Sequence, residues 1–460
     1  EPLRACCAVM RFCGHPVRRF GSIGLLMLAG FTGRAAELPP GRILEPVACA
    51  ADATQTYALY VPASYDRARR WPVLFCFDPA ARGRVPVERF QAAAEKFGYV
   101  VAGSDNSRNG EWAGNATAIN AMINDVNRRL AIDSRRIYVA GLSGGARVAC
   151  QVALTGLAQG VIACSAAFAN SETPAKVPFV FFGTAGLNDF NYLELRRTDR
   201  DLDVRHAPHR VVIFPGGHEW LPPELAVEAV GWLELQAMRS GLRPRDEAWI
   251  AAQFEARHAA VPAQPPGENY LALKSLAGDF KDLADTAALE QRVAALAASR
   301  EIRDWTKAER SRENCERELN DRLASAVQEG MAGSVRKQAD ELRAKANAPE
   351  DSPDRQMATR VLQGIQIYCM ETTRELLRAE NYEAAEPLLA MAAILRPDRP
   401  QTYFDLARAR AHLRDKKGTL EALQQAAAAG FKDAARVEAD QVFAPLRKEP
   451  AYQAAVAAMK

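Results

Sequence analysis

One pentapeptide constrains the fold of this chain more than any other feature. Gly141-Leu142-Ser143-Gly144-Gly145 follows directly on the apolar run 137–140. A serine with small residues two positions before and after it is typical of a sharp strand-to-helix turn that exposes the hydroxyl, because such a turn has no room for larger side chains. A plain glycine-rich turn is the alternative interpretation, since short motifs also occur by chance. The surrounding pattern decides between the two.

Short apolar runs alternate with helical patterns between residues 55 and 240. The runs typical of strands are 56–61, 73–77, 99–102, 137–140, 161–167, 179–182 and 211–214. Several are continuously apolar, as expected for strands covered on both faces. Helical spacing appears between them, for example from Ile119 to Leu130. The pattern predicts an α/β fold, a mostly parallel sheet with helices on both faces, whose functional site lies at the carboxyl ends of the strands.

A carboxylate and a histidine follow later strands, which gives the chain order serine, acid, histidine, one of the orders known for serine nucleophiles. Asp189 comes after the run 179–182, and His218 comes after the run 211–214. Nucleophilic serine needs a base and an acid that orients the base. We therefore predict Ser143, Asp189 and His218 as the catalytic residues. Less well-placed candidates for the acid are Asp199, Asp201, Asp203 and Glu219, and the other histidines (His15, His206, His209, His258 and His412) do not follow a strand of this set.

Backbone amides are the expected donors to an oxyanion. One donor should be the amide of Gly144, which opens the helix after the turn. The second should come from the loop 77–83, where Pro79 has no amide proton to give, so Ala80 or Ala81 would have to donate. For Asp78, an ordinary Asp-Pro turn is at least as good an interpretation as a direct catalytic role.

Three further residues are candidates for contact with a substrate. The polar loop 104–112 follows a strand at the same sheet edge and supplies Asn106 and Trp112. A solvated loop without such contacts is the alternative. Arg147, one turn into the next helix, is either a site for an acidic substrate or, more often for such a residue, a packing residue. Only residues 170–177 separate the strand run 161–167 from the run 179–182, which leaves no room for an inserted domain and predicts an open site.

Residues 45–240 resemble the α/β-hydrolase superfamily. The resemblance lies in Tyr60-Val61-Pro62, in Asp133 with Arg136-Ile137-Tyr138 before Ser143, in the segment ending at Asp189-Phe190, and in the segment around His218. Within the superfamily the chain is most similar to serine esterases of the polyhydroxybutyrate depolymerase, feruloyl esterase and dienelactone hydrolase-like type. This implies hydrolysis of small or polymeric carboxylic esters, without a cofactor. A serine peptidase on the same fold and a non-catalytic interaction protein are the alternatives.

No strand pattern continues beyond about residue 245. Residues 245–368 are expected to form a helical region, and residues 369–460 resemble tetratricopeptide repeats. The likeness lies in the positions Asn381-Tyr382, Ala385, Leu389, Ala392 and Pro397, which recur one period later at Asp415-Lys416, Thr419, Leu423, Ala426 and Phe431. Such repeats bind a protein or peptide partner, or they pack against the catalytic domain.

The N-terminal segment has the form of an export signal. Basic residues from Arg11 to Arg19 precede an apolar run at 23–31 and small residues at 33–36, so residues 1–36 are a predicted signal peptide with the true start at Met10. We expect a periplasmic or secreted protein without a stable membrane anchor. A net charge of +3 without a basic stripe argues against nucleic-acid binding. The cysteines lack metal-ligand spacing, so no metal is expected.

Overall fold

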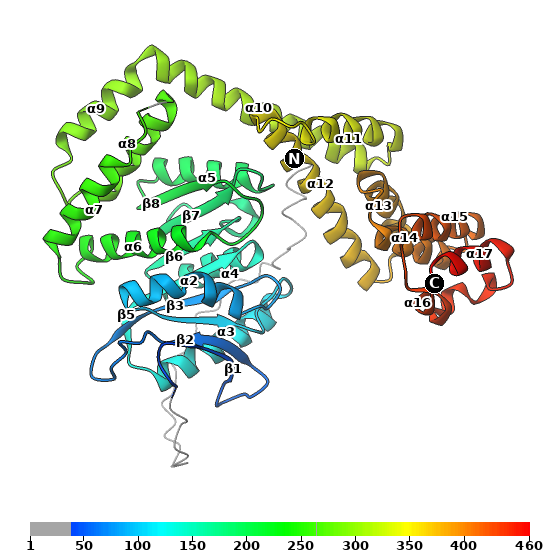
Figure 1. Ribbon diagram of the computed structural model, residues 1–460, viewed down its shortest axis with the longest axis horizontal. Coiled ribbons are helices and arrows are strands. Elements are labelled where there is room, and N and C mark those ends of the chain that lie inside the picture. The colour runs from blue at the N-terminus through cyan, green and yellow to red at the C-terminus, as the bar shows by residue number, and fades with distance from the viewer. Residues whose placement is uncertain (1–37, 264) are drawn as a thin grey trace. The chain divides into compact units, whose positions relative to one another are not determined.

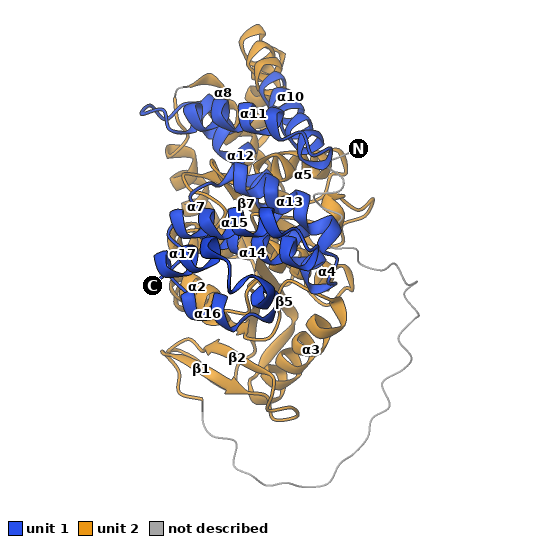
Figure 2. Ribbon diagram, turned by 90° about the vertical axis from the view of Figure 1, so that its right-hand side faces the viewer, with its two compact units in different colours: residues 1–9, 311–460 blue, residues 10–310 orange. Residues whose placement is uncertain are grey.

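The computed structural model describes residues 38–263 and 265–460 (Figure 1). The predicted signal peptide lies outside the described residues. The described residues divide into two compact units, 38–310 and 311–460 (Figure 2). The first unit carries the sheet, and the second is helical.

An eight-stranded sheet forms the centre of the first unit. Its strands are β1 (Ile43–Ala48), β2 (Thr56–Tyr60), β3 (Trp71–Phe77), β4 (Val100–Ser104), β5 (Ile132–Leu142), β6 (Gly160–Cys164), β7 (Val180–Gly186) and β8 (His209–Phe214), in the spatial order β1-β2-β4-β3-β5-β6-β7-β8. β1 and β2 pair antiparallel and β2 is antiparallel to β4, whereas all other pairs are parallel. The predicted fold class is confirmed.

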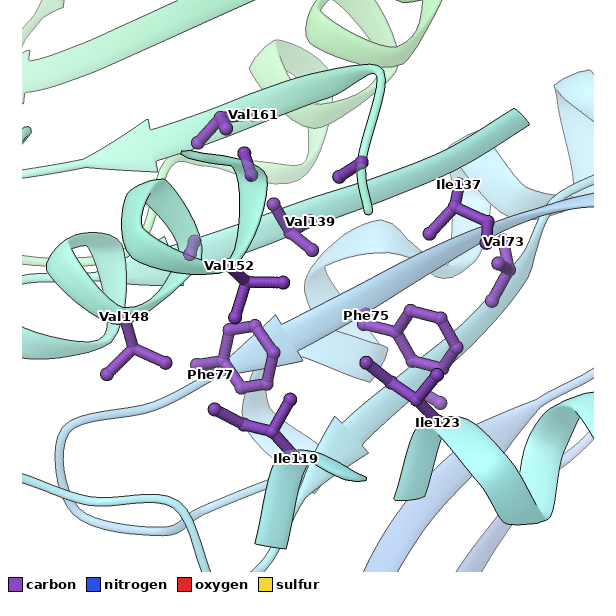
Figure 3. Close-up of a cluster of buried hydrophobic side chains, with 14 of the residues drawn as sticks. Val73, Phe75, Phe77, Ile119, Ile123, Ile137, Val139, Val148, Val152 and Val161 are labelled. Carbon is purple, nitrogen blue, oxygen red and sulfur yellow. The ribbon is translucent and has the colours of Figure 1, made fainter. Parts of the chain in front are cut away.

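Helices cover both faces of this sheet. The helices that follow its strands are α2 (Arg84–Phe97), α3 (Trp112–Arg129), α4 (Gly144–Leu154), α5 (Tyr192–Val204) and α6 (Pro223–Arg239). Side chains alternate along a strand, so Phe75 and Phe77 face α3 and α4 while Leu74 faces α2 and α6. Figure 3 shows part of the core between the sheet and the helices α3 and α4, with Val152 beside Phe77. Burial on both faces explains why these strands are continuously apolar.

The carboxyl ends of the parallel strands meet at one edge. Leu142 of β5 pairs with Cys164 of β6, Cys164 pairs with Thr184 of β7, and Gly186 of β7 pairs with Phe214 of β8. The loops that begin after β5, β7 and β8 therefore leave the sheet side by side. They carry the three predicted catalytic residues.

Three helices beyond the predicted domain boundary belong to the first unit. They are α7 (Glu247–Ala259), α8 (Pro266–Phe280) and α9 (Ala287–Ala298). Leu235 and Met238 of α6 share a core with Leu273 and Phe280 of α8. Trp232 of α6 also donates a hydrogen bond of 2.6 Å to Asp279. The expected boundary near residue 240 thus differs from the structure, because apolar side chains of α6 need these helices to cover them.

Helices alone form residues 311–460. They are the end of α10 (Arg300–Gln328), α11 (Ala332–Ala346), α12 (Pro353–Arg378), α13 (Tyr382–Leu395), α14 (Pro400–His412), α15 (Lys416–Ala428), α16 (Ala434–Ala439) and α17 (Pro450–Ala458). Asn381 caps α13 and Asp415 caps α15, one period of about 34 residues apart. Helices therefore start where the repeat pattern places them, while the assignment to tetratricopeptide repeats stays a prediction. Within the described residues, no helix has the length and apolarity needed to cross a bilayer.

Candidate active site

Ser143 occupies a tight turn between β5 and α4. Its backbone has φ 54° and ψ −120°, a conformation that non-glycine residues rarely adopt, and its amide donates to the carbonyl of Cys164 at 2.8 Å. A Cβ on Gly141 would lie 2.0 Å from the carbonyl oxygen of Gly145, and one on Gly145 would lie 2.0 Å from that of Phe77. The glycines on either side of Ser143 are therefore required by close backbone packing, as expected for a nucleophile elbow.

Replacing Gly145 with alanine should destabilise the protein by about 1–3 kcal/mol, because the added methyl group must displace backbone rather than a flexible side chain. Gly114 is a matched control, since it lies inside α3 with open space around its Cα. Gly114→Ala should be neutral or stabilising by up to about 1 kcal/mol. Urea denaturation measures both. Equal stability of the two variants would show that the elbow is not closely packed.

Asp189 and His218 form a hydrogen-bonded pair. Nδ1 of His218 lies 2.8 Å from Oδ1 of Asp189, which is fully buried, and the ring of Phe190 stacks on the imidazole at 4.1 Å between centroids. The same Oδ1 accepts the amide of Asn191 at 2.9 Å, whereas Oδ2 is buried without a partner among the described residues. With Nδ1 held by the carboxylate, Nε2 is the ring nitrogen that can exchange a proton with a serine.

None of the alternative acids contacts His218 in the described part of the chain. Asp199 and Asp203 of α5 lie 3.4 and 3.7 Å from Nε2 of another histidine, His209. Asp201 lies near Arg197 of its own helix and Arg205 directly after it. The Glu219 carboxylate accepts the amide of Gly217 at 3.1 Å. Geometry therefore selects Asp189 from the predicted carboxylates.

Ser143 lies at the same edge of the sheet as Asp189 and His218. Ser143 directly follows β5, Asp189 follows β7 and His218 follows β8, and the register of the sheet aligns the three strand ends. In the part of the chain that the structure describes, no hydrogen bond joins the Ser143 hydroxyl to His218. Catalytic hydrogen bonds are often long before a substrate binds, so the shared edge, rather than a closed contact, is the relevant geometry.

The amides expected as oxyanion donors in the loop after β3 take part in a turn. The amide of Ala80 donates to Oδ1 of Asp78 at 2.9 Å, and the amide of Ala81 donates to the carbonyl of Asp78 at 3.1 Å. Both amides are thus hydrogen-bonded within the turn, and a role of Ala80 or Ala81 as an oxyanion donor stays a prediction. Gly144 begins α4, and the first amides of a helix have no acceptor inside it. Its role as an oxyanion donor stays a prediction.

Asn106 is held by the edge of the sheet. Its Oδ1 accepts the amide of Thr56 at 2.8 Å, and its Nδ2 donates to the carbonyl of Thr54 at 3.2 Å. These bonds attach the loop to the start of β2, and a substrate contact by Asn106 stays a prediction. Trp112 begins α3 and packs, partly buried, against the core of the sheet. A substrate contact by Trp112 stays a prediction.

Arg147 forms a buried ion pair with Glu194 of α5. Its guanidinium donates to both carboxylate oxygens at 3.0 and 2.9 Å, and Glu194 also accepts the amide of Ala167 and the hydroxyl of Ser171. Burial raises the pKa of Glu194, but Arg147 and the other donors outweigh this, so the pKa lies below its ordinary value. Arg147 is therefore a structural residue that fixes the segment after β6, not a receptor for an acidic substrate.

One polar residue that organises this edge has no signal in the sequence. Asn115 is buried in α3, where its Oδ1 accepts the Ser107 hydroxyl and the Arg108 amide, each at 2.9 Å. Its Nδ2 donates to the carbonyls of Arg108 and Glu111. The side chain thereby shapes the loop that precedes its own helix. Among the described residues, no cluster of three or more His, Cys, Asp or Glu could hold a metal ion.

Comparison with known proteins gives a likeness in fold alone. No protein-family model matches the chain, and neither does any curated protein. A fluorophosphonate-binding serine hydrolase of Staphylococcus aureus has 13% identity, covers 42% of this chain and 98% of its own, and gives a TM-score of 0.34. An esterase of the archaeon Pyrobaculum calidifontis has 13% identity, covers 43% of this chain and 87% of its own, and gives a TM-score of 0.36. Esterase B of Lactobacillus rhamnosis has 16% identity, covers 45% of this chain and 93% of its own, and gives a TM-score of 0.34.

Proposed function

We propose that the protein is an exported serine hydrolase that cleaves carboxylic esters through an acyl-enzyme on Ser143. The observation that carries the proposal is the 2.8 Å contact between His218 and buried Asp189, at the sheet edge where Ser143 occupies a strained elbow. Strained backbone persists where surrounding structure enforces it, and it clusters at functional sites. The three residues provide a nucleophile, a base and an orienting acid.

The chemistry follows from these positions. His218 Nε2 takes the proton of the Ser143 hydroxyl while Oγ attacks the ester carbonyl, and Asp189 stabilises the imidazolium through Nδ1. The tetrahedral intermediate collapses to the acyl-enzyme, and His218 returns the proton to the departing alcohol. Water then attacks the acyl group by the same route in reverse and releases the acid. The amide of Gly144, at the positive end of α4, is the proposed stabiliser of the oxyanion.

An open site fits this proposal. Residues 165–179, which connect β6 and β7, contain only the short 3-10 helix η1 (Ala169–Ser171) among their described elements. No cap domain is inserted there. A bulky or polymeric ester could therefore approach Ser143 across this connection. Export rests on the sequence of residues 1–36, and a protein or peptide partner for residues 369–460 rests on their repeat pattern.

Ester hydrolysis is distinguished from peptidase activity by matched substrates. We expect the purified protein to hydrolyse p-nitrophenyl acetate, p-nitrophenyl butyrate and a bulkier aryl ester, and to leave the corresponding p-nitroanilides intact. An anilide has a poorer leaving group than a p-nitrophenyl ester, so its cleavage needs more transition-state stabilisation than ester cleavage does. Release of p-nitrophenol and p-nitroaniline is followed spectrophotometrically. Anilide cleavage at a comparable rate would favour the peptidase, and turnover of neither would favour the non-catalytic alternative.

A further inference from the structure

The loop that carries His218 is attached at both of its ends. We call residues 215–221, which follow β8, the histidine arch. On the side of β7, the amide of Asn188 donates to the carbonyl of Gly216 at 2.9 Å, and Asp189 holds the imidazole. Above β6, the hydroxyl of Ser165 donates to the carbonyl of Glu219 at 3.3 Å.

The far end of the arch is attached to β3. Trp220 is only 4% exposed, its ring packs edge-on against Phe90, and its Nε1 donates to Oδ2 of Asp78 at 2.9 Å. Asp78 directly follows β3, whereas the arch begins after β8, and the sheet order places β5, β6 and β7 between those strands. The arch therefore crosses the end of β5, the strand that presents Ser143, before it reaches its partner.

Asp78 is built as a fixed anion. It is 1% exposed, and its two oxygens accept from Nε and a terminal nitrogen of Arg82, from the amide of Ala80 and from Trp220, all at 2.9 Å. Burial raises the pKa of Asp78, but the bonds from Arg82, Trp220 and Ala80 outweigh burial and hold the pKa below its ordinary value. With every oxygen engaged, this carboxylate has no position from which to accept a substrate proton.

We propose that Asp78 is a positioning residue that acts through Trp220 to hold the histidine arch, and hence His218, over Ser143. The inference rests on the proposed function, because it names a residue that serves the same site. A carboxylate that binds an indole N–H in a buried setting forms a strong, directional bond. Asp189 fixes the imidazole on one side of the arch, and Asp78 fixes the other side, so the reach of His218 towards β5 is set from both ends.

Trp220→Phe tests this proposal because it deletes the N–H and leaves Asp78 with Arg82 and Ala80. We expect kcat for p-nitrophenyl acetate to fall by about 10- to 100-fold, since displacement of a catalytic group by about 1 Å costs that much. KM should stay within about twofold, because ground-state binding is not touched. A second variant, Trp220→β-(3-benzothienyl)alanine, exchanges only the N–H for sulfur and separates the lost bond from a change in ring size.

Trp232 provides a matched control. It is 2% exposed, and its Nε1 donates to Oδ1 of Asp279 at 2.6 Å. This is a buried indole–carboxylate bond of the same kind, made from within α6 and outside the histidine arch. Trp232→Phe should lower the thermal midpoint comparably and leave kcat within about twofold of the wild type, because the bond does not touch the arch. Equal loss of kcat in both variants, or unchanged kcat in Trp220→Phe, would overturn the proposal.

The position of His218 is also measurable without turnover. Carbethoxylation of His218 by diethyl pyrocarbonate, located by mass spectrometry, should change in rate in Trp220→Phe and not in Trp232→Phe. This reaction rate separates the positioning role of Asp78 from the proposed hydrolase function. A wild-type protein that hydrolyses no ester would refute the proposed function while the His218 rate still tests the arch. An active wild type whose His218 reacts equally in all three proteins would refute the positioning role alone.

Discussion

The Ser143→Ala variant is expected to hydrolyse p-nitrophenyl acetate at least about 10⁴-fold more slowly than the wild type, because no other group can form the acyl-enzyme. The loss should appear in kcat, and the thermal midpoint should stay close to that of the wild type. Alanine accepts the same backbone strain at φ 54° as serine does, and the Ser143 amide keeps its bond to Cys164. Steady-state kinetics and a thermal melt measure the two quantities.

Ser165 is the control for this prediction. It also has a positive φ, 59°, directly after a parallel strand, but it lacks the flanking glycines of the elbow. Ser165→Ala loses one neutral hydrogen bond to Glu219, which should lower kcat by no more than about tenfold. A Ser165→Ala variant as inactive as Ser143→Ala would weaken the assignment of Ser143 as the nucleophile. An active Ser143→Ala variant would refute that assignment.

Arg147→Met should destabilise the protein by about 3–5 kcal/mol at neutral pH, because it leaves the buried Glu194 carboxylate without its cation. Methionine keeps most of the side-chain volume, so the change reports the lost charge rather than a cavity. The side chains of Arg147 and Glu194 are 11% and 9% exposed, so solvent does little to screen the pair. Urea denaturation gives the free energy of unfolding.

Arg197→Met is the surface control. Arg197 is 63% exposed and lies 3.7 Å from Asp201 on the same helix, so its loss should cost less than about 1 kcal/mol. The cost of Arg147→Met should also shrink in acid. The folded-state pKa of Glu194 lies below its ordinary value, so its stabilising effect is present above the unfolded pKa and is lost as the pH falls through the folded one. Equal destabilisation by both variants would show that the buried pair contributes little.

The sheet could be predicted from the sequence because its signal is local. Strands such as β3, buried on both faces, are continuous apolar runs. At Ser143, flanking glycines coincide with the change from a strand pattern to helical spacing. β1 (Ile43–Ala48) was not expected, because Pro46 and exposed positions break the strand pattern at this edge. The packing of α8 against α6 could not be predicted, since the apolar stripe of α6 does not reveal which helices cover it.

The site was predictable where chain order determines it and not where partners come from distant segments. Asp189 and His218 follow strands in the required order, so their meeting could be anticipated. The Asp78 turn had a usable signal, because an aspartate that accepts the amide two residues on forms a common turn. The pairing of Asp78 with Trp220, and of Arg147 with Glu194, depends on segments far apart in the chain, which spacing alone cannot bring together.

The central claim is that Ser143 is an activated nucleophile, and labelling with a fluorophosphonate probe tests it most directly. The probe phosphonylates only a serine whose proton a neighbouring base removes. Intact-mass and peptide mass spectrometry of the full chain should show one adduct on Ser143, which is absent from the Ser143→Ala variant. A wild-type chain that stays unlabelled, or an adduct on another residue such as Ser165, would contradict the account.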